Sequence, residues 1–263
     1  MNIFQLLGLA PNHRDNEKKT TQLVKHWDEV SDIHKHDKKR FGLQLKKDGV
    51  CSITVIRNGS PTIWSRTAKR FTNTWQIDKA IFSMGLRDGV YFGELTCDLE
   101  GISLEVLSGI TNPNRVKPLD SKQDKIANNL TMNFFDMVSI ESFIEGASQT
   151  KFHVRYNNLV ERIYGTGDVP KVLPESVHVI NMFPIEPTEI DGWLNIAVKN
   201  GEEGIIIIDL DAGWEAGHKG WRKMKKVRGC DYDLFCVGYE DGKGKSKGLV
   251  ANLFFKWKGG KQI

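Results

Sequence analysis

The segment Phe41–Arg57, FGLQLKKDGVCSITVIR, alternates apolar and polar residues on both sides of a central Asp48-Gly49 pair. Alternation with a period of two is typical of β-strands, and Asp-Gly is a preferred hairpin turn. The segment therefore predicts a hairpin of two strands, with Lys46 at the end of the first strand. A lysine held next to a tight turn can act as a covalent nucleophile. The KxDG pattern is a weak signal alone, because a simple turn also explains it.

The rest of the chain predicts an α+β protein with largely antiparallel sheets. A helix is expected at residues 15–35, where apolar residues recur at helical spacing. Strand-like pieces lie at residues 62–65, 90–95, 102–107, 133–138, 176–183 and 204–209, and helical ones at 74–84, 121–129 and 157–164. Because the helices are inserted irregularly, a regularly alternating doubly wound fold is not expected.

Composition excludes the membrane and secreted classes. The longest apolar run, Gly204–Ile208, is far shorter than the roughly 20 residues of a membrane-spanning helix. The N-terminal residues lack the basic region and apolar stretch of a signal peptide. The four cysteines form no CxxC pair, so neither a zinc ribbon nor a disulfide framework is expected. We therefore expect a reduced, cytoplasmic protein with no membrane partner.

Charge is distributed unevenly over the 263 residues, whose net charge is +4. From Lys219 to the C-terminus, 12 Lys and Arg face 4 Asp and Glu. Clustered cations attract phosphate and release its counterions, so this end is suited to a polyanion, although a solvated lysine-rich surface is an equal alternative. A domain boundary is expected near Arg228, giving domains at 1–228 and 229–263. Nucleic-acid contacts are expected from Arg70, Lys243 and Lys245.

Four further short motifs follow Lys46 along the chain. Ser65-Arg66-Thr67 comes after a strand, Gly93-Glu94 ends another, and Glu203-Gly204 precedes four isoleucines. The last motif, WRKMK, places Lys223 and Lys225 on one face of a strand. Each motif also has a plain structural explanation, such as a strand end or a solvated face. Together with Lys46 they favour a site.

With these motifs the chain resembles the ATP-dependent DNA ligases, within the covalent nucleotidyltransferases that also include RNA ligases and mRNA capping enzymes. The matching segments, which span about residues 40–260, read LQLKKDGV, WSRTAKRF, YFGELTCD, NFFDMV, EEGIIIID and GWRKMKKV. The resemblance implies an antiparallel-sheet adenylation domain at 1–228 and the first strands of an OB-fold barrel at 229–263. The chain departs from the family pattern at Cys51 and Ile208, where the family usually has basic residues, and at Ala68, where it has glycine.

The resemblance implies a nucleotide site centred on Lys46, which would attack the α-phosphate of ATP and carry AMP. Phe135 would stack on adenine, with Phe134 as the alternative, because strand alternation turns only one of them inward. Glu203 would position Mg²⁺, which prefers carboxylate oxygens. The other implied contacts are Gln44 with the adenine amine, Arg66 and Glu94 with the ribose and nucleotide, Lys223 and Lys225 with the phosphates, and, less firmly, Arg155.

The expected function is that of an ATP-dependent DNA ligase, or its catalytic adenylation subunit, acting on nicked double-stranded DNA. An RNA ligase or capping-type enzyme and a non-catalytic nucleic-acid-binding module are the alternatives. NAD is a minority alternative to ATP, because no N-terminal nicotinamide-recognition module or cysteine cluster is visible. A second ligase subunit could complete the OB-fold, since some tailed bacteriophages divide the ligase between two polypeptides.

Overall fold

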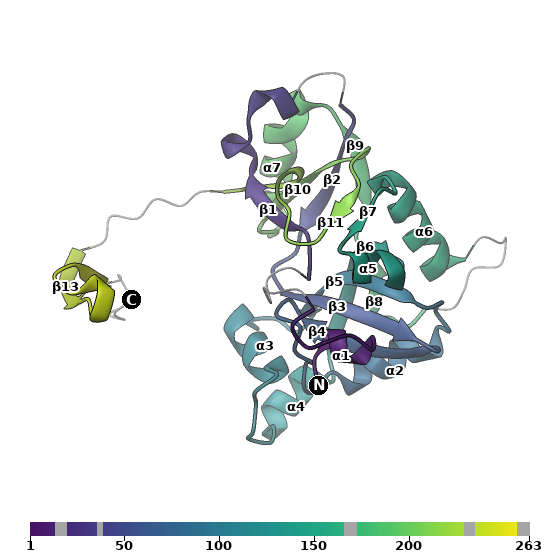
Figure 1. Cartoon of the computed structure of the whole chain (residues 1–263), viewed down its shortest axis with the longest axis horizontal. Helices are drawn as coiled ribbons and strands as arrows, with labels where there is room; N and C mark the ends of the chain where they lie inside the picture. Colours follow the sequence, from purple (N-terminus) through teal and green to yellow (C-terminus); the bar gives the residue numbers. More distant parts are fainter. Residues whose placement is uncertain (14–19, 36–38, 166–172, 229–234, 257–263) are drawn as a thin grey trace. The chain divides into compact units, whose positions relative to one another are not determined.

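The computed structural model describes residues 1–13, 20–35, 39–165, 173–228 and 235–256. By its internal contacts the chain divides into two compact units, Met1–Arg228 and Gly229–Ile263. The first unit combines short helices with two five-stranded sheets (Figure 1). This mixture confirms the predicted α+β class.

The first sheet holds five strands in the order β1-β12-β10-β2-β9. Only the β1–β12 pair is parallel within this sheet. The strands are β1 (Leu23–His26), β12 (Lys219–Val227), β10 (Gly204–Asp209), β2 (Phe41–Lys46) and β9 (Met182–Ile185). All six residues of the central strand β10 are buried. Its unbroken run of isoleucines is explained by this position, because a strand covered on both faces has no solvent side.

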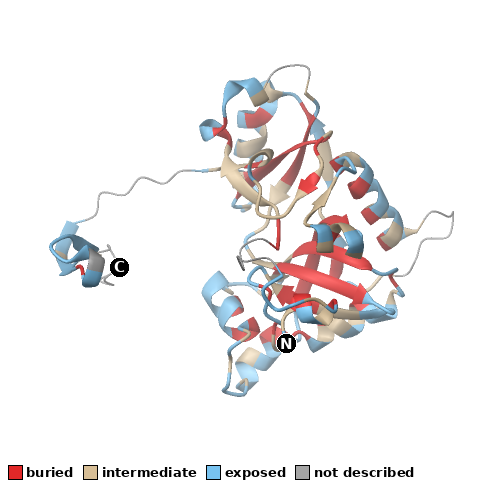
Figure 2. Cartoon of the chain, in the orientation of Figure 1, coloured by how far each residue is buried: buried red, intermediate tan, exposed pale blue. Residues whose placement is uncertain are grey.

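The second sheet has the order β4-β3-β5-β6-β8, in which β6 and β8 are parallel and the other neighbours antiparallel. Its strands are β4 (Ser60–Ser65), β3 (Val50–Arg57), β5 (Gly89–Cys97), β6 (Leu130–Val138) and β8 (Val177–Val179). Buried residues gather on these strands, whereas the helices expose one side (Figure 2). A third, two-stranded sheet pairs β7 (Ala147–Ser148) with β11 (Trp214–Glu215).

Helices cover the sheets and close the hydrophobic cores. α2 (Trp75–Ser83) and α6 (Phe152–Tyr164) contribute buried residues to the same cluster as β6. α7 (Ile190–Lys199) packs against β10 in a separate cluster. The remaining α-helices are α1 (Ile3–Leu6), α3 (Leu104–Thr111), α4 (Ser121–Ala127) and α5 (Ile140–Glu145).

The predicted hairpin around Asp48-Gly49 is wrong. β2 pairs with β10 and β9 in the first sheet, whereas β3 pairs with β4 and β5 in the second. The turn therefore carries the chain from one sheet to the other. Alternation identified both strands correctly, but it contains no information about which strand lies beside which. Lys46 thus ends its strand at the junction of the two sheets.

Two further element predictions are wrong. Within residues 15–35, the described part forms β1 and two short 3-10 turns, η1 (Trp27–Glu29) and η2 (Asp32–His34), in place of a helix. Pairing with β12 outweighs the local helical spacing there. The strand expected at 102–107 is the start of α3, whose N-cap Ser103 accepts a hydrogen bond from the Val106 amide at 3.4 Å. The cap and the spacing of buried Leu107 and Ile110 favour a helix.

The described residues of the second unit, 235–256, form one antiparallel strand pair, β13 (Phe235–Asp241) and β14 (Val250–Lys256). No closed barrel is formed by the described residues of this unit. In the part of the chain that the structure describes, no helix is long and apolar enough to cross a membrane.

Candidate active site

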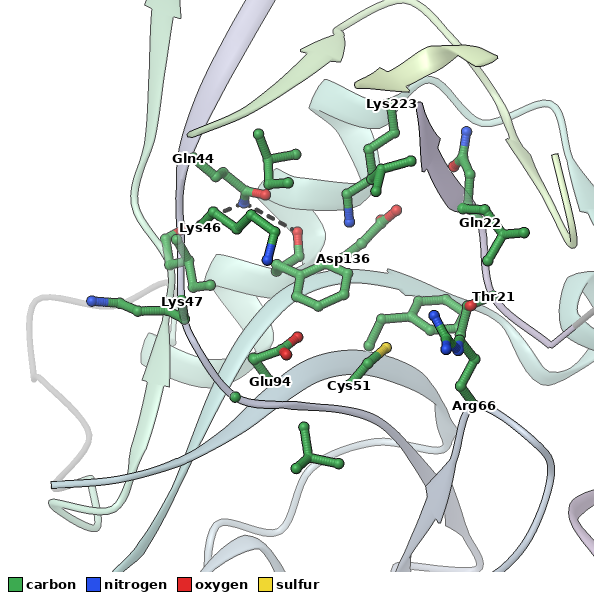
Figure 3. A pocket seen from close by; sticks show the side chains of 18 of the residues that line it. Thr21, Gln22, Gln44, Lys46, Lys47, Cys51, Arg66, Glu94, Asp136 and Lys223 are labelled. Atoms are coloured by element: carbon green, nitrogen blue, oxygen red, sulfur yellow. Dashed lines mark hydrogen bonds between the residues drawn. The ribbon is translucent and has the colours of Figure 1, made fainter. Parts of the chain in front are cut away.

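A cavity of about 470 Å³ lies in the first unit, lined by residues of both five-stranded sheets. The side chains of Lys46, Glu94, Asp136 and Lys223 point toward one space (Figure 3). Lys47 also borders the cavity, but its side chain extends outward and pairs with Glu202. The expected site residues that line this cavity are Gln44, Lys46, Arg66, Glu94, Phe135 and Lys223.

Lys46 is held beside Glu203 by the pairing of β2 with β10. Lys46 stands opposite Gly204 in the register, and the Glu203 amide donates to the Lys46 carbonyl at 3.3 Å. The Lys46 ammonium forms an ion pair with the Glu203 carboxylate. A second ion pair, between Lys47 and Glu202, lies next to the first. Strand register thus brings the KxDG and EG motifs together, 157 residues apart in sequence.

Gly49 allows the chain to pass closely over β5 as it leaves Lys46. A Cβ atom at this position would lie 2.5 Å from the Leu95 carbonyl oxygen and 2.8 Å from the Glu94 Cγ atom. The glycine therefore serves close approach, which is one of the uses of a residue without a side chain. Its neighbour Glu94 is held under the Lys46 turn as a result.

Burial controls the ionisation of Glu94 and Cys51, which face each other in the β3–β5 register. Burial raises the pKa of the Glu94 carboxyl to about 7; Glu203 and Asp48 add to the rise, and Lys46 and Lys223 oppose it. Burial also raises the pKa of the Cys51 thiol to about 12, with a contribution from Glu94. Cys51 is therefore a neutral thiol at pH 7 and does not replace the positive charge of the family's usual arginine.

A β-bulge presents Phe135 to the cavity. In the pairing of β5 with β6, Phe92 faces Asp136 and Gly93 faces Phe134, so Phe135 is an extra residue between them. Bulges of this kind re-aim side chains and are common beside active sites. Phe134 is fully buried in the core, whereas Phe135 and Asp136 both line the cavity. The preference for Phe135 over Phe134 agrees with this placement.

A buried ion pair lies behind Phe135. Both Asp136 carboxylate oxygens accept hydrogen bonds from Arg155 at 2.9 Å. Arg155 also donates to the carbonyls of Thr150 at 2.5 Å and Ala212 at 3.3 Å. The pair joins β6 to α6 and fixes the strand at the bulge. The predicted arginine is thus present at the site, but it contacts Asp136 and does not line the cavity.

Lys223 extends from β12 over the Phe135 ring, with its Nζ atom 3.8 Å from the ring centroid. Burial lowers the pKa of its ammonium, and Asp136 is the largest opposing influence. Lys225 lies opposite Ile206, which lines the cavity, but Lys225 does not line it. The structure thus brings Lys223, and not Lys225, to the cavity wall, and the role expected of Lys225 with the phosphates stays a prediction.

Gln44 closes one end of the cavity. Its side-chain amide donates to the carbonyls of Phe135 at 3.2 Å and Ile180 at 3.4 Å. The amide is thereby oriented beside Phe135, where an adenine ring is expected.

The expected nucleic-acid residues lie outside the cavity. Arg70 is exposed and forms an isolated β-bridge with Trp64. Lys243 is exposed in the second unit, and the Lys245 side chain lies outside the described residues. Sequence reasoning missed the role of Asp136 in binding Arg155 and the ion pair of Lys47 with Glu202, because motif spacing does not reveal partners.

The donor set suits a magnesium ion that is shared with a substrate. Among the described residues, no group of three His, Cys, Asp or Glu side chains could hold a metal alone. Mg²⁺ is usually bound through one or two carboxylates plus substrate phosphates. Glu203, partly exposed beside Lys46, and Glu94, which interacts electrostatically with Glu203, supply that number.

Comparison with known proteins identifies the family. The ATP dependent DNA ligase domain matches residues 21–225. A probable DNA ligase of Anaeromyxobacter dehalogenans is 31% identical over 83 residues, which are 32% of this chain and 16% of the relative. A DNA ligase of Methanopyrus kandleri is 32% identical over 123 residues, 46% of this chain and 20% of the relative. The matches thus span at most a fifth of these two relatives' length.

Solved structures share the fold at low sequence identity. The structure named Pmar-Lig_PreS3 has a TM-score of 0.73 at 20% identity, covering 93% of this chain and 55% of that chain. The ATP-dependent DNA ligase from bacteriophage T7, in complex with ATP, has a TM-score of 0.63 at 14% identity, with coverage of 95% and 81%. The match of the family over residues 21–225, together with this fold, shows that the chain belongs to the ATP-dependent DNA ligase domain family.

Proposed function

We propose that this chain is the adenylating part of a DNA ligase, with Lys46 as its nucleophile and ATP as its nucleotide. The observation that carries the proposal is the convergence of Lys46, Glu94, Phe135 and Lys223 on one cavity, with Glu203 paired to Lys46, in a chain of this family. A lysine beside a carboxylate is common on protein surfaces. A lysine that shares a cavity with an aromatic ring, on which a base can stack, and with a second lysine, which can bind phosphate, is suited to a nucleotide.

The first step forms a bond between the Lys46 Nζ atom and the α-phosphorus of ATP. The bond from that phosphorus to the oxygen bridging the β-phosphate breaks, and pyrophosphate leaves with the electron pair. Lys46, an ammonium in its ion pair, would first give one proton to Glu203 and become the attacking amine. The nitrogen would lose its second proton to water once the bond to phosphorus has formed. Lys223 would balance the charge that develops on the transferring phosphate. Lys225 would join only after a shift, because it does not line the cavity now.

Binding of the nucleotide uses the walls of the cavity. Phe135 would stack on adenine, the Gln44 side chain would contact the base, and Arg66 and Glu94 would contact the ribose. A magnesium ion held by Glu203, with Glu94 nearby, would neutralise phosphate charge when bound. Gln44, Arg66, Glu94 and Phe135 all line one pocket, and Glu203 joins them through its ion pair with Lys46, which supports these roles.

The acceptor we propose is the 5′-phosphate at a nick in double-stranded DNA. A phosphate oxygen attacks the AMP phosphorus and the bond to Lys46 breaks; the 3′-hydroxyl then attacks the 5′-phosphate and AMP leaves. Arg70 and Lys243 are exposed cations suited to backbone phosphates, and Lys245 stays a prediction. The cytoplasmic location also stays a prediction.

A second polypeptide is proposed to bind the β13–β14 pair. Large apolar side chains are exposed there, with Phe235 77%, Tyr239 63% and Leu253 51% accessible. An isolated two-stranded sheet is marginally stable in water, and further strands would cover these side chains. The partner expected is a β-rich ligase subunit that completes an OB-fold.

The decisive experiment is self-labelling. The protein is incubated with α-labelled ATP and Mg²⁺, with labelled NAD in parallel, and then separated by denaturing electrophoresis. We expect a covalent label from ATP that is lost in Lys46→Ala and kept in Lys47→Ala, the adjacent control. Labelling that persists in Lys46→Ala would refute the assignment, and labelling from NAD would change the cofactor. Nicked DNA and nicked RNA offered to the labelled protein identify the acceptor.

A further inference from the structure

Phe135 offers one accessible side to a ligand. The residue packs against the hydrophobic cluster that contains Phe92, Phe143 and Trp214, and it also lines the cavity. A base that stacks on Phe135 must therefore do so from the cavity. The Nζ atom of Lys223 already lies over the ring, 3.8 Å from its centroid.

The contact with Phe135 is a weakly held resting position for the Lys223 ammonium. Within the described residues, no carboxylate lies within 4.0 Å of this atom. The nearby carboxylate of Asp136 is engaged through both oxygens by Arg155. A cation over an aromatic ring is attracted by the ring electrons, but a charge-assisted hydrogen bond to a phosphate oxygen is stronger.

We propose that Lys223 acts as a gate on the base-stacking face of Phe135, one that opens at low cost only for a ligand carrying phosphates. A phosphorylated nucleotide supplies a new partner for the ammonium as the base takes its place on the ring. Adenosine supplies none, so its binding must displace the cation without compensation. The gate thus selects adenine nucleotides against the nucleoside. This inference rests on the proposed nucleotide site and adds a specificity role for Lys223.

The size of the effect follows from the contact. A ligand that binds one of two states has its affinity reduced by the fraction of protein in the competent state. The contact of Lys223 with Phe135 is a partly desolvated cation–π contact. A contact of this kind reduces the fraction of protein with a free Phe135 face about five- to thirtyfold. Removing the cation should therefore tighten adenosine binding by about this factor, while it weakens the binding of phosphorylated ligands.

The test measures two ligands by calorimetry in the full chain. One is adenosine, and the other is an ATP analogue with a methylene group between the α- and β-phosphorus, which prevents transfer to Lys46. In Lys223→Met we expect adenosine to bind about five- to thirtyfold more tightly and the analogue at least tenfold more weakly. Lys226→Met is the matched control, because Lys226 lies on the same strand and pairs with Asp191. It should change neither affinity.

The outcomes can be distinguished because Lys223→Met is expected to change the affinities for adenosine and for the analogue in opposite directions. If adenosine binds Lys223→Met no more tightly than it binds the original protein, the gate is refuted, while binding of the analogue by the original protein leaves the proposed function standing. If the original protein binds neither ligand, both proposals are refuted. When Phe135→Leu is already present, adding Lys223→Met should no longer tighten the binding of adenosine. Tighter adenosine binding in that double variant would refute the role of the ring. Circular dichroism confirms that each variant is folded.

Discussion

The buried pair of Asp136 and Arg155 gives the most quantitative prediction. Their side chains are 9% and 4% exposed, and both carboxylate oxygens are bound by the guanidinium. Arg155→Met fills much of the same volume but leaves the Asp136 charge buried without its partner. Removal of one member of a buried pair costs about 3–5 kcal/mol. For a domain of this size that corresponds to a fall in Tm of about 6–20 °C.

Urea denaturation of Arg155→Met, Asp136→Asn and the double variant measures this cost. The double variant should be less destabilised than the sum of the single changes, because it no longer contains an unpaired charge. Lys151→Met is the surface control, since its pair with Asp211 is 55% and 35% exposed and should contribute less than about 1 kcal/mol. A cost for Arg155→Met below about 1 kcal/mol, or strictly additive effects, would refute the reasoning.

Three further predictions concern the cavity. Gly49→Ala should reduce self-labelling at least tenfold with little loss of secondary structure, because the added Cβ would collide with Leu95 and Glu94; unchanged labelling would show that the close approach has no role. The raised pKa of Glu94, about 7 against 4.5 for the free side chain, means that its contribution to stability is fully present below pH 4.5 and is lost as the pH rises through 7. In thermal melts, the Tm of Glu94→Gln should therefore rise relative to that of the original protein as the pH increases from 4.5 to 7. Plots of Tm against pH that run parallel for the two proteins would contradict the raised pKa of Glu94. Chelation of divalent metal should abolish self-labelling and leave Tm unchanged, because the described residues offer no self-contained metal site; a large fall in Tm would instead indicate a structural ion.

The sequence was sufficient for the identity of most strands and for six of the residues that line the cavity, namely Gln44, Lys46, Arg66, Glu94, Phe135 and Lys223. The alternation in 41–57, the isoleucine run of β10 and the lysines of β12 each depend on local pattern, and each strand formed as expected. Pairing was not predictable in the same way. Whether β2 and β3 form a hairpin depends on which strands cover their edges, and those strands lie more than 130 residues apart in sequence for β2.

Local signals also failed where two patterns competed. In α3, the apolar residues Leu104, Val106 and Leu107 fit a strand as readily as a helix until the Ser103 cap is considered. The β-bulge at Phe135 could not be predicted either, because it exists only in the register between β5 and β6. Strict alternation would have turned Phe135 and Asp136 to opposite sides of the sheet, and the bulge brings both to the cavity.

The resting partners of the two central lysines suggest how the pocket prepares for a nucleotide. Lys46 is paired with Glu203, and Lys223 lies on Phe135. Each lysine thus already has the kind of contact that a phosphate would replace. In the proposed function, release of Lys223 would free the stacking face of Phe135 for the base, and release of Lys46 would free Glu203 for a metal ion and the amine for attack. Since one bound triphosphate would cause both exchanges, base recognition and activation of the nucleophile should occur together, and a ligand without phosphates should achieve neither.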